Sequence, residues 1–344
     1  MLQRTASLVN PILAETPEMS QCTTSVDSFR RSALLWLLWP LIFVLSSVAA
    51  GEDAEPRPLI SAVELGERLH DPKLRLIDMG LERSTFDTGH LPHAQYVNWK
   101  SEITDPAKPE RYNIINREGM QALLRKLGIS RDSLIVVYDN VQNRLATRMY
   151  WSLRYYGHDN VRVLDGGILA WQKAGLAVTK TVDDFTKTDY RIEKNRKHWT
   201  VDMAVIAKHL EDSDVKLVDG RPDGQYSGKD RGRVFHTGKY HKQRGHIPGA
   251  MNIPWKANLN PDGTFKSRKE LAEIYKDVLS SKRCITYCNE GLHAAMPWFV
   301  LSELLKSKDV AIYDDSMSEW ANSDQKTTVT AEPKLKQSVP ALIQ

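Results

Sequence analysis

Six residues, Cys288 to His293, have the types and spacing to do chemistry, because they join a strand pattern to a helix pattern. The run RCITYC that ends at Cys288 is rich in β-formers and predicts a buried strand. The run AAMPWFVLSELL after the loop is apolar at helical spacing, and Pro297 falls where a first helical turn tolerates proline. Gly291 can adopt a positive φ, which lets the loop curl and turn backbone N–H groups inward at the positive end of the helix dipole. The pattern therefore predicts a cradle for an anion, with Cys288 at its centre.

A cysteine in such a cradle would have its thiolate stabilised and its pKa lowered. The same donors would stabilise a persulfide anion, Cys–S–S⁻, so we expect Cys288 to be a nucleophile that can hold a second sulfur atom. Cys284 lies within the predicted strand, and we expect a buried core thiol there. The two sulfurs should not pair, because four strand residues span roughly 13 Å and a disulfide needs Cα atoms within about 7 Å. The third cysteine, Cys22, lies in the leader described below.

The chain contains an internal repeat. A strand ending at an aspartate and a Gly-His-hydrophobic-Pro-x-Ala turn occur first at Asp78 and His90, and again at Asp219 and His246. We expect the two histidines to hold turn structure, and Asp219 to fix the local turn and orient the arginine that follows it. The alternative for His90 is that it faces the catalytic cleft from the other domain. Self-similarity of this kind predicts a duplicated domain.

The register of the repeat extends through the remaining strands. SLIVVYDN matches CITYCNE, and VRVLDGGILAW matches VAIYDDSMSEW. The sequence distance from Asp139 to Trp171 equals that from Cys288 to Trp320, and both tryptophans are expected to be packing residues. Asp139 therefore stands where Cys288 stands in the second copy. A carboxylate cannot carry sulfur, so only the second copy has a candidate nucleophile.

Each copy alternates short apolar strands with helical patterns, and the run SRKE at Ser267–Glu270 is a capping-box helix start. This alternation predicts an α/β fold, with a mainly parallel sheet flanked by helices in each copy. Ligands of such sheets bind at the carboxyl ends of the strands, which is where Cys288 is predicted to lie.

Composition excludes some classes of function. The chain has 344 residues, 41% hydrophobic and 26% charged, which suits two domains with sizeable cores. A formal net charge of +4 is too weak to argue for nucleic acid, but it is compatible with a small anionic substrate. Neither zinc-type Cys/His spacing nor a Gly-rich phosphate loop occurs in the sequence, so no metal and no cofactor is expected. The two copies can bury their faces against each other, so we expect a monomer.

Residues 1–50 read as a secretory signal peptide, because Arg30 and Arg31 precede the apolar run ALLWLLWPLIFVLSSVAA and its small-residue exit. An uncleaved membrane anchor and a twin-arginine signal are the alternatives. Translation from Met19 rather than Met1 would give the basic region before the apolar run a more usual length. We expect an exported body, in the periplasm and free of the membrane once the leader is cut.

Over residues 57–325 the sequence resembles the rhodanese family of sulfurtransferases in its tandem two-domain form. The resemblance is carried by Asp219-x-Arg221, the turn GHIPGAMNIP, the six-residue loop from Cys288 and the closing YDDSMSEW. It implies two tandem rhodanese-like domains, the first inactive and the second catalytic. The expected boundaries are 51–178 for the non-catalytic domain, 179–199 for a linker, 200–325 for the catalytic domain and 326–344 for a tail.

The resemblance also implies a mechanism of double displacement. Cys288 would take the outer sulfur of a small anionic donor such as thiosulfate, and pass it from the persulfide to a thiophilic acceptor such as cyanide or a thiol. Arg221 would lie at the pocket mouth, and Arg244 could also face the substrate. The other expected substrate-binding residues belong to the loop: Asn289, Glu290, Gly291, Leu292 and His293.

The loop departs from common family patterns, and alternatives stay open. Glu290 would repel a dianionic donor if it pointed inward, so 3-mercaptopyruvate is an alternative donor. His293 could tune the sulfur or be a surface residue. The basic insertion 224–245 is either a solvated loop or a funnel for anions.

Three other classes of function were weighed. A persulfide carrier for another exported protein would look the same in sequence. Cysteine phosphatases use Cys-x5-Arg, but Ala294 occupies the arginine position here. A Cys–His hydrolase lacks an evident partner for Cys288.

Overall fold

The computed structural model of the protein describes residues 57–108, 112–235, 237–324 and 328–330. The predicted leader, residues 1–50, lies wholly outside the described residues, and so does the predicted tail apart from residues 328–330. None of the described helices combines the length and the apolar character that crossing a bilayer requires.

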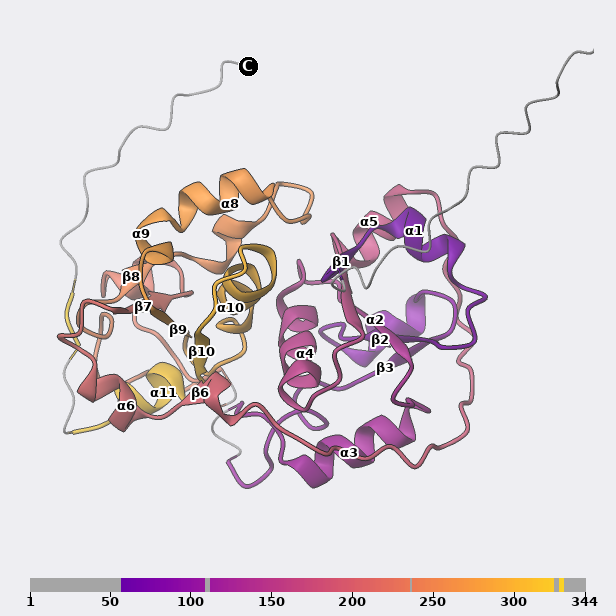
Figure 1. Ribbon diagram of the computed structural model, residues 1–344, viewed down its shortest axis with the longest axis horizontal. Coiled ribbons are helices and arrows are strands. Elements are labelled where there is room, and N and C mark those ends of the chain that lie inside the picture. The colour runs from indigo at the N-terminus through magenta and orange to yellow at the C-terminus, as the bar shows by residue number, and fades with distance from the viewer. Residues whose placement is uncertain (1–56, 109–111, 236, 325–327, 331–344) are drawn as a thin grey trace, which may run out of the picture. The chain divides into compact units, whose positions relative to one another are not determined.

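The described chain forms two five-stranded sheets that share one topology. The strand order is β1-β5-β4-β2-β3 in the first sheet and β6-β10-β9-β7-β8 in the second, and all pairings between these strands are parallel (Figure 1). The order in the second sheet reproduces the first position by position, which confirms the duplicated α/β domain. The strands of the first sheet are β1 (Leu59–Ile60), β2 (Leu74–Asp78), β3 (Ala94–Tyr96), β4 (Leu134–Tyr138) and β5 (Val161–Leu164). Those of the second are β6 (Thr200–Val201), β7 (Val215–Asp219), β8 (Met251–Asn252), β9 (Arg283–Tyr287) and β10 (Val310–Tyr313).

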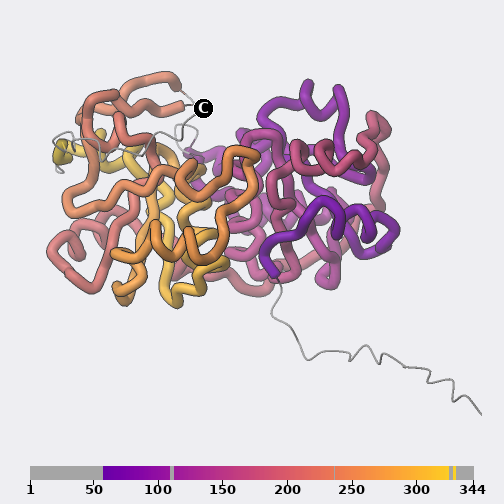
Figure 2. The backbone as a smooth tube through the Cα atoms, turned by 90° about the horizontal axis from the view of Figure 1, so that it is seen from above, coloured from indigo at the N-terminus to yellow at the C-terminus, as the bar shows by residue number. Residues whose placement is uncertain are grey.

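Helices connect the strands in each copy, and the tube in Figure 2 shows the first copy from indigo to magenta and the second from rose-red through orange to yellow. The helices of the first copy are α1 (Ala62–Glu67), α2 (Arg83–Thr88), α3 (Arg117–Lys126), α4 (Arg144–Tyr155) and α5 (Gly167–Lys173). Those of the second are η1 (Lys197–Trp199), α6 (Met203–Lys208), α7 (Asp223–Tyr226), η2 (Trp255–Asn258), α8 (Arg268–Ile274), α9 (Lys276–Leu279), α10 (Ala295–Phe299), η3 (Val300–Leu304) and α11 (Ser316–Trp320). The predicted capping box at Ser267 and Glu270 is confirmed.

Both faces of each central strand are buried, as a parallel sheet requires. In β4, Ile135 and Val137 belong to one apolar cluster, and Val136, between them, belongs to another. The first of these clusters is shared by the two domains, since it also contains residues of α10. Tyr150 of α4 packs edge-on against Phe299 of α10, with ring centroids 4.9 Å apart. The two copies therefore bury their apolar faces against each other.

The segment predicted as a linker lies against the first domain. Thr179 pairs with His90 through the backbone, and Arg125 Nε donates to the Tyr190 carbonyl at 2.8 Å. Tyr190 and Ile192 are buried. These contacts anchor the chain between the two sheets along most of its length.

A buried ion pair joins the two domains beside the loop of Cys288. Arg148 of α4 is fully buried and contacts Asp314, which follows β10, with Nη1 2.6 Å from Oδ1. Arg148 Nη2 donates to the Tyr112 carbonyl at 2.9 Å, and the Ile114 N–H donates to Asp314 Oδ2 at 2.8 Å. The Gly291 carbonyl in the loop also accepts from Arg148, at 3.4 Å. The pair therefore ties the loop of the second domain to a helix of the first.

Replacing Asp314 with Asn should lower the free energy of unfolding by about 3–5 kcal/mol, because the Arg148 charge would stay buried without its partner. Equilibrium urea unfolding measures this loss. The matched control is Asp214→Asn, which breaks the exposed pair between Asp214 and Lys282 and should leave the unfolding curve nearly unchanged. Equal losses in the two variants would contradict the structural role of the buried pair.

Candidate active site

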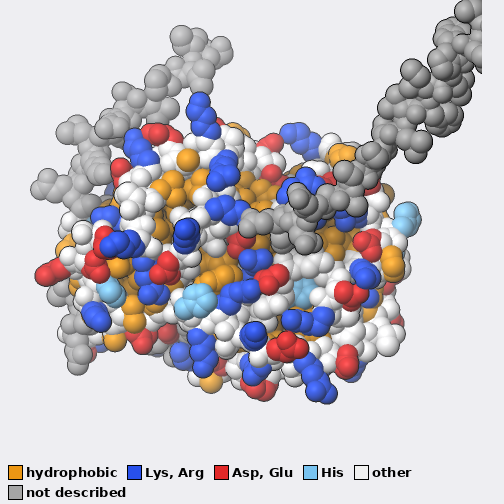
Figure 3. Space-filling model, in the orientation of Figure 1, with side chains coloured by type: hydrophobic (Ala, Val, Ile, Leu, Met, Phe, Trp, Pro, Cys, Tyr) orange, Lys and Arg blue, Asp and Glu red, His pale blue; other side chains and the backbone are white. Residues whose placement is uncertain are grey.

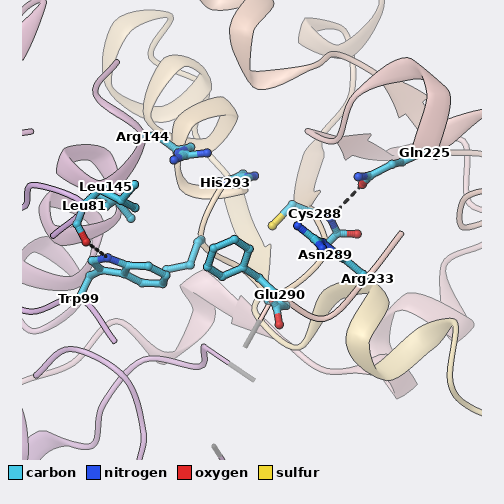
Figure 4. A pocket seen from close by; sticks show the side chains of 12 residues that line it. Leu81, Trp99, Arg144, Leu145, Gln225, Arg233, Cys288, Asn289, Glu290 and His293 are labelled. Atoms are coloured by element: carbon cyan, nitrogen blue, oxygen red, sulfur yellow. Dashed lines mark hydrogen bonds between the residues drawn. The ribbon is translucent and has the colours of Figure 1, made fainter. Parts of the chain in front are cut away.

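Cys288 is the first residue after β9, and its side chain is 2% exposed. Its sulfur lies at a pocket of about 210 Å³ whose walls come from both domains (Figure 4). The first domain contributes Leu81, Trp99, Arg144 and Leu145. The second contributes Gln225, Arg233, Phe235, Cys288, Asn289, Glu290, Leu292 and His293. The cysteine thus occupies the predicted place at the carboxyl end of a parallel strand.

The loop after Cys288 curls around the sulfur. The backbone N–H groups of Glu290, His293 and Ala294 act on it as donors that lower the pKa of the thiol. Gly291 has a φ of 82°, and a Cβ built there would lie 2.3 Å from Asp314 Oδ1, so the curl requires glycine at this position. Ser316 Oγ accepts from the N–H groups of Cys288 and Gly291, both at 3.1 Å, which fixes the two ends of the curl. This arrangement is the cradle that the sequence predicted.

The sequence prediction for the thiol pKa was wrong in sign. Burial raises the pKa of the Cys288 thiol above its ordinary value, and the Glu290 carboxylate adds to this rise. The three N–H donors lower the pKa and offset only part of the effect of burial. The motif reveals donors around the sulfur, but it does not reveal how far the sulfur is withdrawn from water.

The equivalent loop of the first domain is already filled by an anion. Asp139 follows β4 and is buried, and its two carboxylate oxygens accept four backbone N–H groups at 2.8–2.9 Å. The donors are Val141, Asn143, Leu145 and Ala146. This geometry confirms that Asp139 stands in the place of Cys288. It also shows that the loop of this fold is built to hold a negative charge.

Most of the predicted loop residues line the pocket. Asn289, Glu290, Leu292 and His293 lie on its wall, and Gly291 shapes the curl behind it. Asn289 is fixed on two sides: its Nδ2 donates to Gln225 Oε1 at 2.9 Å, and its Oδ1 lies 3.1 Å from His241 Nε2. The loop is therefore held by side chains on both flanks.

His293 is uncharged at neutral pH. Burial lowers its pKa to about 3, and the nearby positive charge of Arg144 adds to the effect. Its side chain is half-buried on the wall of the pocket. A neutral imidazole cannot supply positive charge to the sulfur.

Neither Arg221 nor Arg244 is among the residues that line the pocket, although negative charge on Cys288 helps to raise the pKa of Arg221. Their role in substrate binding stays a prediction. Arg221 is 1% exposed, and its guanidinium is bound by Asp219, with Nη2 2.6 Å from Oδ2, and by the Gly245 carbonyl. Arg244 is exposed and donates to the backbone carbonyls of Gly228 and Lys229. Both arginines hold the turn that carries His246, because their donors are used by groups of the turn and the insertion.

The two turn histidines have the structural role that the repeat predicted. The rings of His90 and Phe86 stack with centroids 3.7 Å apart, and His246 stacks on Tyr226 at the same distance. Each histidine Nδ1 also bonds the backbone carbonyl of its stacking partner. Neither ring lines the pocket.

Seven residues of the pocket wall were not among the predicted site residues: Leu81, Trp99, Arg144, Leu145, Gln225, Arg233 and Phe235. Arg233 and Phe235 come from the insertion, and the Phe235 ring packs 6.1 Å from that of Trp99 in the first domain. Arg144 is as far beyond Asp139 as His293 is beyond Cys288. The register of the repeat could therefore have marked Arg144 as the counterpart of a loop residue.

The charges outside the pocket are mixed in sign. Figure 3 shows lysine and arginine side chains interspersed with aspartate and glutamate on the face it presents. Among the described residues, no group of three or more His, Cys, Asp or Glu side chains is arranged to hold a metal ion. The two described cysteines, Cys284 and Cys288, are both free, as predicted.

A free thiol inside a ring of amide donors, at the end of a parallel strand, defines a class of cysteine-dependent enzymes that hold an anionic sulfur. The Rhodanese-like domain family matches residues 61–174 and 202–323, so the chain belongs to the rhodanese family of sulfurtransferases. The match covers both copies of the repeat, which confirms the tandem arrangement.

Two relatives extend this assignment. The chain is 34% identical over 279 residues to the sulfur carrier protein TtuD of Thermus thermophilus, covering 78% of this chain and 95% of that protein. It is 32% identical over 277 residues to a thiosulfate sulfurtransferase of Corynebacterium glutamicum, covering 79% and 90% of the two chains. Among solved structures, the 3-mercaptopyruvate sulfotransferase SseA of Escherichia coli shares the fold, with a TM-score of 0.67 and 24% identity over 76% of this chain and 98% of that one.

Replacing Gly291 with Ala should slow sulfur transfer at least about tenfold. The left-handed backbone costs a non-glycine residue about 1–3 kcal/mol, and the added Cβ would clash with Asp314. Steady-state kinetics measure the loss, since tenfold corresponds to about 1.4 kcal/mol.

The matched control is Gly175→Ala, where φ is 73° but no atom lies within 4 Å of the new Cβ. This variant should keep its transfer rate. A Gly291→Ala enzyme as fast as the control would mean that the curl is not needed for catalysis.

Proposed function

We propose that the protein is a thiosulfate sulfurtransferase that carries sulfane sulfur on Cys288. The observation that carries this proposal is the Cys288 sulfur itself, which receives three backbone N–H groups at a pocket that also contains Arg144 and Arg233. Two cations suit an anionic donor, and the amide donors suit a negative charge on sulfur. The relative of Corynebacterium glutamicum bears the name of this activity.

In the first half-reaction, the Cys288 thiolate attacks the outer sulfur of thiosulfate. A new S–S bond forms to Cys288, the old S–S bond breaks, and sulfite leaves with its electron pair. The persulfide keeps one negative charge and sulfite takes two, so charge is conserved. The N–H groups of Glu290, His293 and Ala294 stabilise the anion in both states.

In the second half-reaction, a thiophilic acceptor attacks the terminal sulfur of the persulfide. Cyanide leaves as thiocyanate, and a thiolate leaves as its own persulfide. In either case the Cys288 thiolate is regenerated with the electron pair of the broken S–S bond. The resting cradle then holds the same charge as before, so the cycle can repeat.

The walls of the pocket favour a second candidate donor, 3-mercaptopyruvate. Leu81, Trp99, Phe235 and Leu292 give the pocket an apolar side that suits a carbon skeleton. Glu290 also disfavours a dianion more than a monoanion. With this donor the thiolate would again take sulfur, and pyruvate would leave with the thiol proton on its methyl carbon.

The proposal also covers the cellular location and the oligomeric state of the protein. We propose an exported, monomeric protein, on the strength of the leader pattern in residues 1–50 and of the apolar faces that the two copies bury against each other. The leader lies outside the described residues, so this part of the proposal rests on sequence.

Steady-state assays with each donor, with cyanide as acceptor, test the proposal. We expect turnover with thiosulfate at a higher kcat/KM than with 3-mercaptopyruvate, and background rates for Cys288→Ser. The matched control is Cys284→Ser, because Cys284 is equally buried but lies within β9, 3.3 Å from Ser281 Oγ. This variant should keep its activity.

The reverse order of donors would establish the mercaptopyruvate reading. Absence of turnover with both donors would overturn the small-molecule enzyme and favour a carrier that receives sulfur from another protein.

A further inference from the structure

We infer that Arg144, from the non-catalytic domain, is a catalytic residue that stabilises the anionic sulfur of Cys288, as thiolate and as persulfide. This inference rests on the proposed function and assigns the first domain a part in the chemistry. It is carried by the position of Arg144 on the wall of the Cys288 pocket, by the lack of a hydrogen-bond or ion-pair partner for its guanidinium among the described residues, and by the nature of the other charges in the pocket.

The cradle of the first domain fixes where Arg144 lies. Arg144 is the first residue of α4, and Asp139 binds the backbone N–H groups of both its neighbours, Asn143 and Leu145, at 2.8 Å. Asn143 Nδ2 also donates to the Gly263 carbonyl of the catalytic domain at 3.0 Å. The helix start is thus anchored within its own domain and across the interface, so the guanidinium is delivered from a rigid base.

The same helix holds the catalytic loop one turn further along. Arg148 follows Arg144 by one helical turn and contacts the Gly291 carbonyl and Asp314. Figure 4 shows Arg144 reaching toward His293 and the Cys288 sulfur from the side of the first domain. One face of α4 therefore both positions the loop and directs a cation at its centre.

In the described part of the chain, the Arg144 charge interacts with two negative groups, Asp139 of its own domain and Cys288 across the pocket. No carboxylate or carbonyl pairs with its guanidinium there, and its Nε is buried without a hydrogen-bond partner. It packs only over the Trp255 ring, 5.4 Å from the centroid. Arg144 is half-buried and burial lowers its pKa, so a nearby anion would offset part of the cost of its charge. The sulfur of Cys288 is the anion that the reaction generates in this pocket, and negative charge on Cys288 and Asp139 opposes the lowering of the Arg144 pKa by burial.

The charge of the buried Arg221 also interacts with Cys288, but its guanidinium is paired with Asp219. The other ionisable groups that line the pocket are less suited to this role. His293 stays neutral because its pKa is lowered to about 3. Glu290 carries the wrong sign and raises the thiol pKa. Arg233 is exposed, so solvent screens its charge. Burial raises the pKa of the Cys288 thiol, and in this proposal Arg144 supplies positive charge that favours the thiolate.

The test is the pH dependence of Cys288 alkylation by iodoacetamide, measured in full-length protein carrying Cys22→Ser and Cys284→Ser, so that Cys288 is its one cysteine. Alkylation reports the thiolate without requiring any sulfur donor, so it stands even if the proposed donor is wrong. Arg144→Gln should raise the apparent pKa of Cys288 by about one, because an opposite charge within a few ångströms shifts a pKa by about 1–3. It should also slow persulfide formation from thiosulfate about tenfold.

Two further variants make the test specific. Arg144→Lys keeps the charge and should recover most of the wild-type pKa and part of the rate. Arg191→Gln removes an exposed arginine away from the pocket and should behave as wild type. Far-UV circular dichroism of each variant verifies that the protein is folded.

An unchanged Cys288 pKa in folded Arg144→Gln would overturn the inference. If only the rate with thiosulfate fell, Arg144 would bind the donor rather than stabilise the cysteine sulfur, and the inference would again fail.

Discussion

The stabilisation of one negative charge on a sulfur withdrawn from water is the constraint on which the rest of the structure depends. Burial disfavours a thiolate, so donors have to be brought to it. The chain supplies them from its own backbone, at the end of β9, where the loop turns Glu290, His293 and Ala294 N–H groups onto Cys288. Glycine at position 291 and the Ser316 hydroxyl are what keep that loop curled.

The duplication shows the same device in two states. In the first domain, the ring of N–H groups holds the Asp139 carboxylate permanently, so the charge serves structure. In the second, the ring holds a sulfur whose charge can come and go with the reaction. The Asp139 loop anchors the start of α4. In turn, α4 holds the Cys288 loop through the buried contacts of Arg148 with Asp314 and the Gly291 carbonyl. The first copy, which has Asp139 in place of the cysteine, contributes part of the wall of the Cys288 pocket.

The sequence was sufficient for what depends on periodicity and local backbone geometry. Strand–helix alternation, the repeat register and the Cys288 loop were readable because they follow from the spacing of apolar residues and glycine. The hydrogen-bond partners of Arg221 and Arg244 could not be predicted from the sequence, because the tertiary fold decides which acceptors lie near a guanidinium. Here these acceptors are Asp219 and backbone carbonyls. The pKa of Cys288 was misjudged for a related reason, since burial belongs to the assembled fold. The residues that the first domain contributes to the pocket could not be predicted either, because they reach it only through the packing of the two copies against each other.

The central claim is that Cys288 carries sulfur as a persulfide, and intact-protein mass tests it most directly. The full chain is incubated with thiosulfate, freed of excess donor and weighed beside Cys288→Ser. The account predicts a gain of one sulfur atom that cyanide removes and that the variant never shows. No gain in the wild-type protein, or an equal gain in Cys288→Ser, would contradict it.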